Sequence, residues 1–133
     1  MRSIIKQSVR LPASPRTLFE MYIDPAKHAE ITGAPVTIAA AAGSPFRGFD
    51  GRLSGTMLAV VSPVLIVQSW RSVGFGDADP DSTLILGFAR DGDGGRIDLV
   101  HLDVPECDYQ GVTEGWEKFY WTPWRAYLAA RID

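Results

Sequence analysis

Few side chains in this sequence have the chemistry of a catalyst, and the most promising are His101 and Asp103. One residue separates them, so in an extended strand they lie on the same face. His101 can act as a general base or orient a ligand carbonyl, with Tyr120 as a second hydrogen-bonding group. The alternative is a buried neutral histidine that one neighbour satisfies. We favour this alternative and assign no catalytic residue, because the sequence places no third group beside the pair.

Other patterns that could support chemistry are weak. A metal site built from His101, Asp103, Glu106 and Cys107 has only its first two ligands on one strand face, so we expect no metal and no other cofactor. The sequence has no Gly-x-Ser-x-Gly motif, which argues against a hydrolase triad. Cys107 is the single cysteine and cannot form an internal disulfide, which fits a reducing compartment and predicts a cytoplasmic protein.

Composition excludes several classes of protein. The chain has 133 residues, of which 46% are hydrophobic and 22% charged, a profile that excludes intrinsic disorder. A net charge of -3 provides no cationic field for nucleic acid. The longest apolar run, residues 57–67, is too short to span a membrane, and the N-terminus lacks the apolar segment of a signal peptide. We expect a single domain over residues 1–133, with no nucleic-acid partner and no membrane span.

The N-terminal part of the chain predicts a strand followed by two short helices. Residues of one parity from Ile5 to Leu11 indicate the strand. Ser14-Pro15 and Asp24-Pro25 each combine an N-cap residue with proline at the first helical position. Gly33 is then expected to end the second helix.

The middle of the chain predicts strands joined by turns at Ser62-Pro63 and at residues 91–95. The expected strands are Val36 to Ala39, Phe46 to Phe49, Arg52 to Val61, Leu65 to Val73, Thr83 to Arg90 and Arg96 to Asp103. Their alternation predicts a sheet with one buried face. That face would carry Leu53, Met57, Ala59 and Val61, then Ile66, Gln68 and Trp70, then Ile97, Leu99 and His101.

After Pro105 the pattern becomes helical, with Asp108 or Thr113 as the expected cap. At about 100° per residue, one broad apolar stripe contains Tyr109, Val112, Trp116, Phe119, Tyr120, Pro123, Trp124 and Tyr127. Trp121 and Leu128 lie at its edge and make the arc wider than one sheet needs, so we predict that they form a homodimer interface. Packing against the helix that starts after Ser14 is the alternative.

Pro123 falls inside this helix, where it removes a backbone hydrogen bond and predicts a kink. A kinked helix over a curved sheet can leave a void, and a void lined by Trp and Tyr rings can hold a ligand.

The order of these elements resembles the START/SRPBCC superfamily, which includes the birch-pollen allergen fold. Local motifs are similar to its branch of activators of heat-shock-protein-90 ATPase homologues. The similar pieces are Ala13-Ser14-Pro15 with Leu18-Phe19, Asp24-Pro25, Gly51, Gly55, Val61-Ser62-Pro63, Gln68 to Arg71, His101 to Pro105, Gly115-Trp116, Tyr120, Pro123-Trp124 and Tyr127-Leu128. The sequence differs between His28 and Ile31, where relatives often place a tryptophan. The resemblance covers nearly the whole chain. It implies an α+β helix-grip fold: a curved antiparallel sheet wrapped around a long C-terminal helix, with two short helices after the first strand.

The resemblance also implies a cavity between sheet and helix that holds an apolar or amphipathic small molecule. We therefore predict a small-molecule-binding module, with Gln68 and His101 as polar contacts. The expected ligand-binding residues are Met57, Gln68, Trp70, Phe88, Leu99, His101, Trp116, Phe119 and Tyr120.

Two other functions remain as alternatives. One is an enzyme that acts on a carbonyl or polyketide-like substrate through His101 and Tyr120. The other is a chaperone cofactor or protein-interaction module. The co-chaperone that names the branch carries an additional N-terminal domain, which this sequence lacks, so we do not favour a chaperone partner.

Overall fold

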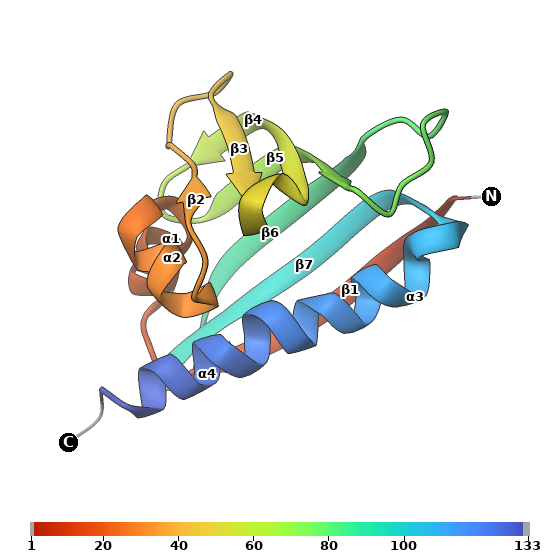
Figure 1. The fold of residues 1–133 in the computed structure, drawn as a ribbon. Coiled ribbons are helices and arrows are strands. Elements are labelled where there is room, and N and C mark those ends of the chain that lie inside the picture. The colour runs from red at the N-terminus through yellow and green to blue at the C-terminus, as the bar shows by residue number, and fades with distance from the viewer. Residues whose placement is uncertain (1, 132–133) are drawn as a thin grey trace.

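A computed structural model describes the backbone of residues 2–131 and the side chains of residues 3–131. Seven strands form one antiparallel sheet in the order β1-β7-β6-β5-β4-β3-β2 (Figure 1). The strands are β1 (Arg2–Leu11), β2 (Val36–Thr37), β3 (Pro45–Gly48), β4 (Leu53–Val61), β5 (Leu65–Ser72), β6 (Ser82–Asp91) and β7 (Gly94–Pro105). All seven predicted strands are present, and only β2 is much shorter than expected. β2 to β7 follow one another as a meander, and β1 joins the far edge by pairing with β7.

The two short helices after β1 begin where the sequence predicts, and the second also ends at the predicted residue. α1 (Pro15–Ile23) starts after Ser14, whose side chain accepts a hydrogen bond from the backbone N–H of Thr17. α2 (Pro25–Thr32) starts after Asp24 in the same way and ends at Gly33, whose φ of 76° is left-handed. Because proline lacks an N–H and has a helical φ, both helices accept it in the first turn at no cost.

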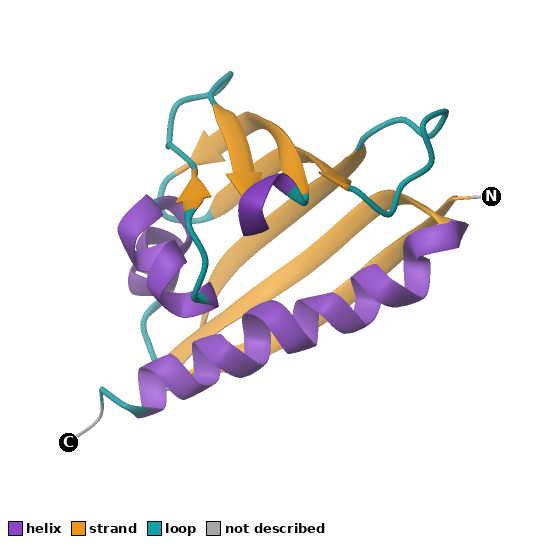
Figure 2. Cartoon of the chain, viewed as in Figure 1, coloured by secondary structure: helices purple, strands orange, loops and turns teal. Residues whose placement is uncertain are grey.

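A long helical segment runs along β7 and β1 across one face of the sheet (Figure 2). It consists of α3 (Glu106–Gly115), the π-helical segment η2 (Trp116–Trp121) and α4 (Thr122–Ala129). It begins at Glu106 directly after Pro105, with no side-chain cap, so neither Asp108 nor Thr113 is the start that we expected.

The helix accommodates Pro123 through the π segment that precedes it rather than through a sharp kink. The backbone N–H of Thr122 donates to the carbonyl of Glu117, five residues earlier. Proline at 123 has no N–H to donate and its ring crowds the preceding turn. A wider turn with bonds between residues five apart relieves that crowding. The π segment also changes which residues face the sheet, as described below.

Two β-bulges overturn parts of the predicted strand faces. In β4 the pairing with β5 shifts between Met57 and Ala59, so one extra residue reverses the alternation. Met57 is buried as predicted, but Val61 is exposed. In β7 the pairing with β1 shifts between His101 and Val104, where Asp103 has a φ of 62°. His101 is therefore buried while Asp103 is exposed, and the two do not share a face.

The core lies between the sheet and the helices, as the helix-grip architecture requires. Buried side chains of β5, β6 and β7 alternate along each strand with more exposed residues. Ile66, Gln68 and Trp70 on β5 and Ile97, Leu99 and His101 on β7 all face inward, as predicted. The fold is thus the predicted α+β arrangement of a curved antiparallel sheet and a long C-terminal helix.

Candidate functional site

A cleft of about 370 Å³ opens between the long helix and the region where β4 and β5 meet the segment η1 (Phe49–Gly51). This volume is at the lower end of the range for small-molecule sites. Its lining is mostly apolar and consists of Phe49, Arg52, Leu53, Trp70, Ser72, Val73, Gly74, Asp108, Gly111, Val112, Gly115, Trp116, Phe119 and Tyr120.

Four of the nine predicted ligand-binding residues line this cleft: Trp70, Trp116, Phe119 and Tyr120. The other five, which are Met57, Gln68, Phe88, Leu99 and His101, lie outside its lining and are buried in the protein. Strand parity correctly predicts that four of them, Met57, Gln68, Leu99 and His101, face inward. It does not distinguish side chains that fill the core from side chains that border a space.

Aromatic rings form a continuous wall along the cleft. The ring centroids of Trp70 and Trp116 are 6.1 Å apart, and those of Trp116 and Tyr120 are 4.9 Å apart. Phe49 packs on the other side, with centroids 5.6 Å from Phe119 and 6.2 Å from Tyr120. Phe119 is 48% exposed and forms the rim. Such a wall suits a flat apolar ligand.

Sequence reasoning missed the contribution of η1 and of two glycines in α3. Phe49 and Asp50 have φ values of 50° and 57°, a left-handed conformation that costs about 1–2 kcal/mol per residue. No periodic pattern predicts such a loop. Gly111 and Gly115, however, are four residues apart in the predicted helix, and this spacing leaves a smooth strip on one helix face.

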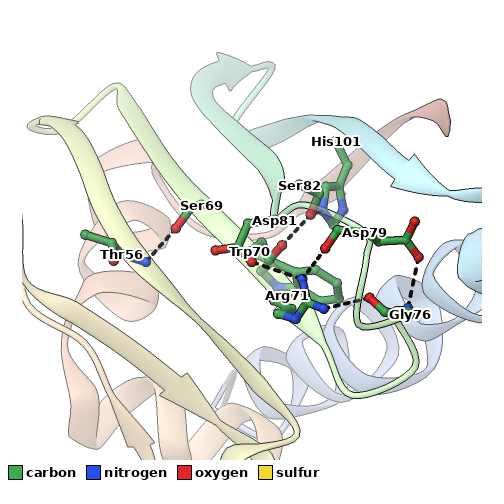
Figure 3. A network of polar contacts seen from close by, with 9 residues as sticks. All are labelled: Thr56, Ser69, Trp70, Arg71, Gly76, Asp79, Asp81, Ser82 and His101. Atoms are coloured by element: carbon green, nitrogen blue, oxygen red, sulfur yellow. Dashed lines mark hydrogen bonds and ion pairs between the residues drawn. The ribbon is translucent and has the colours of Figure 1, made fainter.

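His101 is held in a chain of hydrogen bonds behind the aromatic wall. The indole N–H of Trp116 donates to His101 Nδ1 at 3.2 Å. Because an indole nitrogen only donates, Nδ1 must be unprotonated and the proton of the neutral ring lies on Nε2. Nε2 is 2.8 Å from Ser82 Oγ, which in turn donates to the carbonyl of Trp70 at 2.6 Å (Figure 3). Burial lowers the pKa of His101 to about 3, so the ring is neutral at pH 7.

This arrangement does not bring His101 and Tyr120 together as a catalytic pair. Both ring nitrogens of His101 already have partners. The Trp116 ring contacts both, with centroids 5.9 Å from His101 and 4.9 Å from Tyr120. Asp103 is exposed, because the β-bulge after His101 turns it away from the buried face of the sheet. Across the described chain, no cluster of three or more His, Cys, Asp or Glu side chains is arranged to hold a metal ion.

A second buried polar group, which sequence reasoning missed, surrounds His28. His28 Nδ1 is 2.7 Å from the carbonyl oxygen of Tyr22, and Nε2 is 2.8 Å from the Tyr120 hydroxyl. The Tyr22 hydroxyl donates to Gln68 Oε1 at 2.6 Å. Burial lowers the pKa of His28 to about 4, against a smaller opposing effect of the Tyr22 carbonyl. Burial likewise raises the pKa of both tyrosines. A lone histidine in a short polar helix carries no sequence signal for this role.

Trp121 and Leu128, predicted at a dimer interface, are instead buried within the chain at 3% and 8% exposure. The Trp121 ring stacks between those of Trp116 and Trp124, and its indole N–H donates to Gln7 Oε1 at 2.7 Å. The π segment explains the difference, because its wider turn brings residues five apart, Trp116 and Trp121, onto one face. Trp121 therefore has its partners within the chain, in the neighbouring rings and in Gln7 of β1.

The loop after β5 borders the cleft and is tied down by Arg71. The guanidinium donates to the carbonyls of Asp79 at 2.6 Å and Gly76 at 2.8 Å, and it lies 3.3 Å from the Asp81 carboxylate (Figure 3). Within this loop Phe75 packs on Trp70, with centroids 5.9 Å apart. Arg71 thus fixes the loop that carries Val73 and Gly74, which border the cleft beside Trp70.

The antiparallel sheet, the long helix laid across it and the cleft between them define a helix-grip protein. A family model described as "Activator of Hsp90 ATPase homolog 1-like protein" matches residues 12–129, so the chain belongs to this family. No curated protein sequence matches the chain significantly. The helices of the described part are too short or too polar to cross a membrane.

Several solved structures have a similar fold. An HSP90 activator from Plasmodium falciparum superposes with a TM-score of 0.84 at 18% identity, covering 95% of this chain and 96% of that one. A Mesorhizobium loti protein gives 0.83 at 17% identity, covering 98% and 99%. The solution structure of an Aha1 dimer from Colwellia psychrerythraea gives 0.79 at 12% identity, covering 95% and 96%. At these identities the likeness is one of fold.

Proposed function

We propose that this protein binds a small, largely apolar molecule with a flat aromatic or polycyclic body in the cleft between η1 and the long helix. The observation that carries the proposal is the cleft of about 370 Å³ together with its wall of rings from Phe49, Trp70, Trp116, Phe119 and Tyr120. A cleft of this size with an apolar, ring-lined wall has the character of a small-molecule site.

An unpaired donor supports the same proposal. The Trp70 indole N–H is buried and has no hydrogen-bond partner in the described part of the protein. Leaving such a group unpaired costs about 1–3 kcal/mol. Because Trp70 lines the cleft, an acceptor on a ligand can recover that cost if the indole ring turns its buried N–H toward it.

Binding fits the site better than catalysis does. The candidate base, His101, has both ring nitrogens engaged, and its low pKa leaves it a weak base. The cleft lining contains the charged residues Arg52 and Asp108 and the hydroxyl of Ser72, but no histidine that could activate that hydroxyl as a base. We therefore propose a carrier or sensor and assign no reaction.

Gly115→Leu provides a variant that blocks the cleft without disturbing the backbone. Gly115 lines the cleft in helical conformation, and a Cβ there would meet only the Phe119 ring, at 3.6 Å. Replacing a helical glycine also favours the helix by up to about 1 kcal/mol. Ala126→Leu is the matched control, because Ala126 is exposed on α4 outside the cleft lining.

The test is to purify all three proteins, extract them with organic solvent and identify bound compounds by mass spectrometry. The same proteins are then screened with apolar aromatic compounds by thermal denaturation. We expect an extracted compound, or a rise in melting temperature, with the wild type and Ala126→Leu but not with Gly115→Leu. Equal binding by all three proteins, or no binding by any, would contradict the proposal.

A chaperone partner is a second candidate, motivated by the similar fold of the Plasmodium falciparum HSP90 activator. Addition of the purified protein to an Hsp90 ATPase assay tests it, and unchanged turnover argues against it. The fold relative from Colwellia psychrerythraea is a dimer. Because Trp121 and Leu128 are buried here, we propose no interface through them, and light scattering at micromolar concentration tests self-association through any other face.

A further inference from the structure

Tyr120 lines the cleft, and the proton on its hydroxyl decides which groups that hydroxyl can bind. The hydroxyl oxygen lies 2.8 Å from His28 Nε2, and His28 itself is outside the cleft lining. A tyrosine hydroxyl has one proton to donate and two lone pairs to accept with. Its partner His28 therefore determines whether Tyr120 offers the cleft a donor or an acceptor.

The protonation of His28 follows from its other contact. The carbonyl oxygen of Tyr22 can only accept, and it lies 2.7 Å from His28 Nδ1, so Nδ1 carries a proton. The ring is 1% exposed and packs against Tyr22, Phe46 and Tyr120, so it is neutral and carries only that one proton. Nε2 is then a bare lone pair, and it accepts the hydroxyl proton of Tyr120.

We propose that His28 is a positioning residue that accepts the Tyr120 proton and so directs it away from the cleft. The site then selects apolar ligands that carry a hydrogen-bond donor, such as a phenol, an alcohol or an amine. This inference rests on the proposed function and specifies its ligand class. A ligand carbonyl or ether facing Tyr120 meets a lone pair and not a proton. The Trp116 indole N–H is committed in the same way to His101. Of the cleft's indoles, only that of Trp70 has no partner among the residues the structure describes.

The ligand arm of the test compares 2-naphthol, which can donate, with 2-methoxynaphthalene, which can only accept. Affinities are measured by tryptophan fluorescence titration. One neutral hydrogen bond corresponds to a preference of about five-fold, so we expect 2-naphthol to bind the wild type about five-fold more tightly. Tyr120→Phe removes the acceptor and is expected to abolish the preference. His28→Phe frees the Tyr120 proton and is expected to reduce or reverse it. Tyr127→Phe is the control, because Tyr127 lies on the same long helix outside the cleft lining and is expected to keep the preference.

A ligand-free arm keeps the inference testable even if a variant fails to fold. The chain has two histidines, so the ¹⁵N spectrum of histidine-labelled wild type at neutral pH contains only two rings. We expect opposite tautomers, with the proton on Nδ1 for His28 and on Nε2 for His101. A His28 proton on Nε2, a charged ring, or equal binding of the two naphthalenes would overturn the inference and leave the proposed function standing. If neither compound binds the wild type while the tautomers are as expected, the proposed function fails and the ligand class fails with it.

Discussion

At the scale of single residues, two buried histidines do structural work at the back of the cleft. His28 and His101 are each almost inaccessible and each uses both ring nitrogens. They hold the polar ends of Tyr120 and Trp116, the two rings that meet at the centre of the aromatic wall. Both must be neutral to do so, which makes the fold sensitive to acid.

This sensitivity predicts how stability depends on pH. Burial lowers the pKa values of His28 and His101 to about 4 and about 3, from an ordinary value of 6.5. The unfolded chain therefore binds more protons in acid, so stability is complete above about pH 6.5 and is lost as the pH falls toward the folded-state values. Each histidine is expected to remove about 2 kcal/mol between about pH 7.5 and about pH 5.

Urea denaturation across this range measures the effect, and the His28→Gln variant serves as the comparison. Removing one titrating ring should make the loss of stability shallower by about 2 kcal/mol over that interval. A free energy of unfolding with the same pH dependence in the variant and the wild type would show that His28 is not buried in its neutral form.

Trp121 gives a second prediction at this scale, because its two interpretations differ sharply. If Trp121 is a core residue bonded to Gln7, Trp121→Ala is expected to lower the free energy of unfolding by about 3–5 kcal/mol. As an exposed interface residue it would cost the monomer little. The control is Phe119→Ala. Because Phe119 is half exposed, this substitution is expected to lower the free energy of unfolding by less than about 2 kcal/mol. Chemical denaturation at low protein concentration separates the two cases.

At the scale of elements, the long helix depends on its π segment for the way it meets the sheet. Gln7 of β1 binds the helix at two points, donating to the Thr113 carbonyl and accepting from the Trp121 indole. These two points lie on either side of the first π turn. A regular helix would place Trp116 and Trp121 on different faces, whereas here their rings stack with centroids 5.6 Å apart.

The loop after β5 yields a prediction at the same scale. Arg71 donates to two loop carbonyls, and a lysine cannot reproduce this planar, forked contact. We expect Arg71→Lys to destabilise the protein by about 1–2 kcal/mol and to speed hydrogen exchange in residues 73–81. The exposed Arg90→Lys is the control. Unchanged exchange in this loop would mean that the contacts of Arg71 do not hold the edge of the cleft.

The same elements show what the sequence can and cannot predict. Caps at Ser14 and Asp24 act within one turn of helix, and the structure confirms both. The bulges near Met57 and Asp103 and the π segment before Pro123 each change the count of residues per turn or per pair. The bulges reverse the facing prediction for the next residues of the strand, whereas the π segment moves Trp121 from the edge of the apolar stripe into the core and leaves Trp124 buried as predicted. Each depends on how an element packs against a partner far along the chain. Periodicity within a segment carries no information about that packing.

At the scale of the whole molecule, the fold was predictable because many independent local patterns agreed on one order of elements. The site was only partly predictable. Trp116 and Tyr120 were found because helical spacing places them toward the sheet. Phe49 was missed because its loop is left-handed, and His28 because its partner Tyr120 lies 92 residues away in the sequence. The empty volume itself is a property of the assembled sheet and helix, not of any segment.

If a small apolar molecule occupies this cleft, the indole N–H groups of the four tryptophans report on it directly. Trp70 and Trp116 line the cleft, whereas Trp124 is buried outside its lining. The decisive measurement is a titration of ¹⁵N-labelled protein with 2-naphthol, following the indole N–H signals. We predict saturable shifts of the Trp70 and Trp116 signals, little change for Trp124, and no such pattern in Gly115→Leu. Stationary Trp70 and Trp116 signals, or the same shifts in Gly115→Leu, would contradict the account.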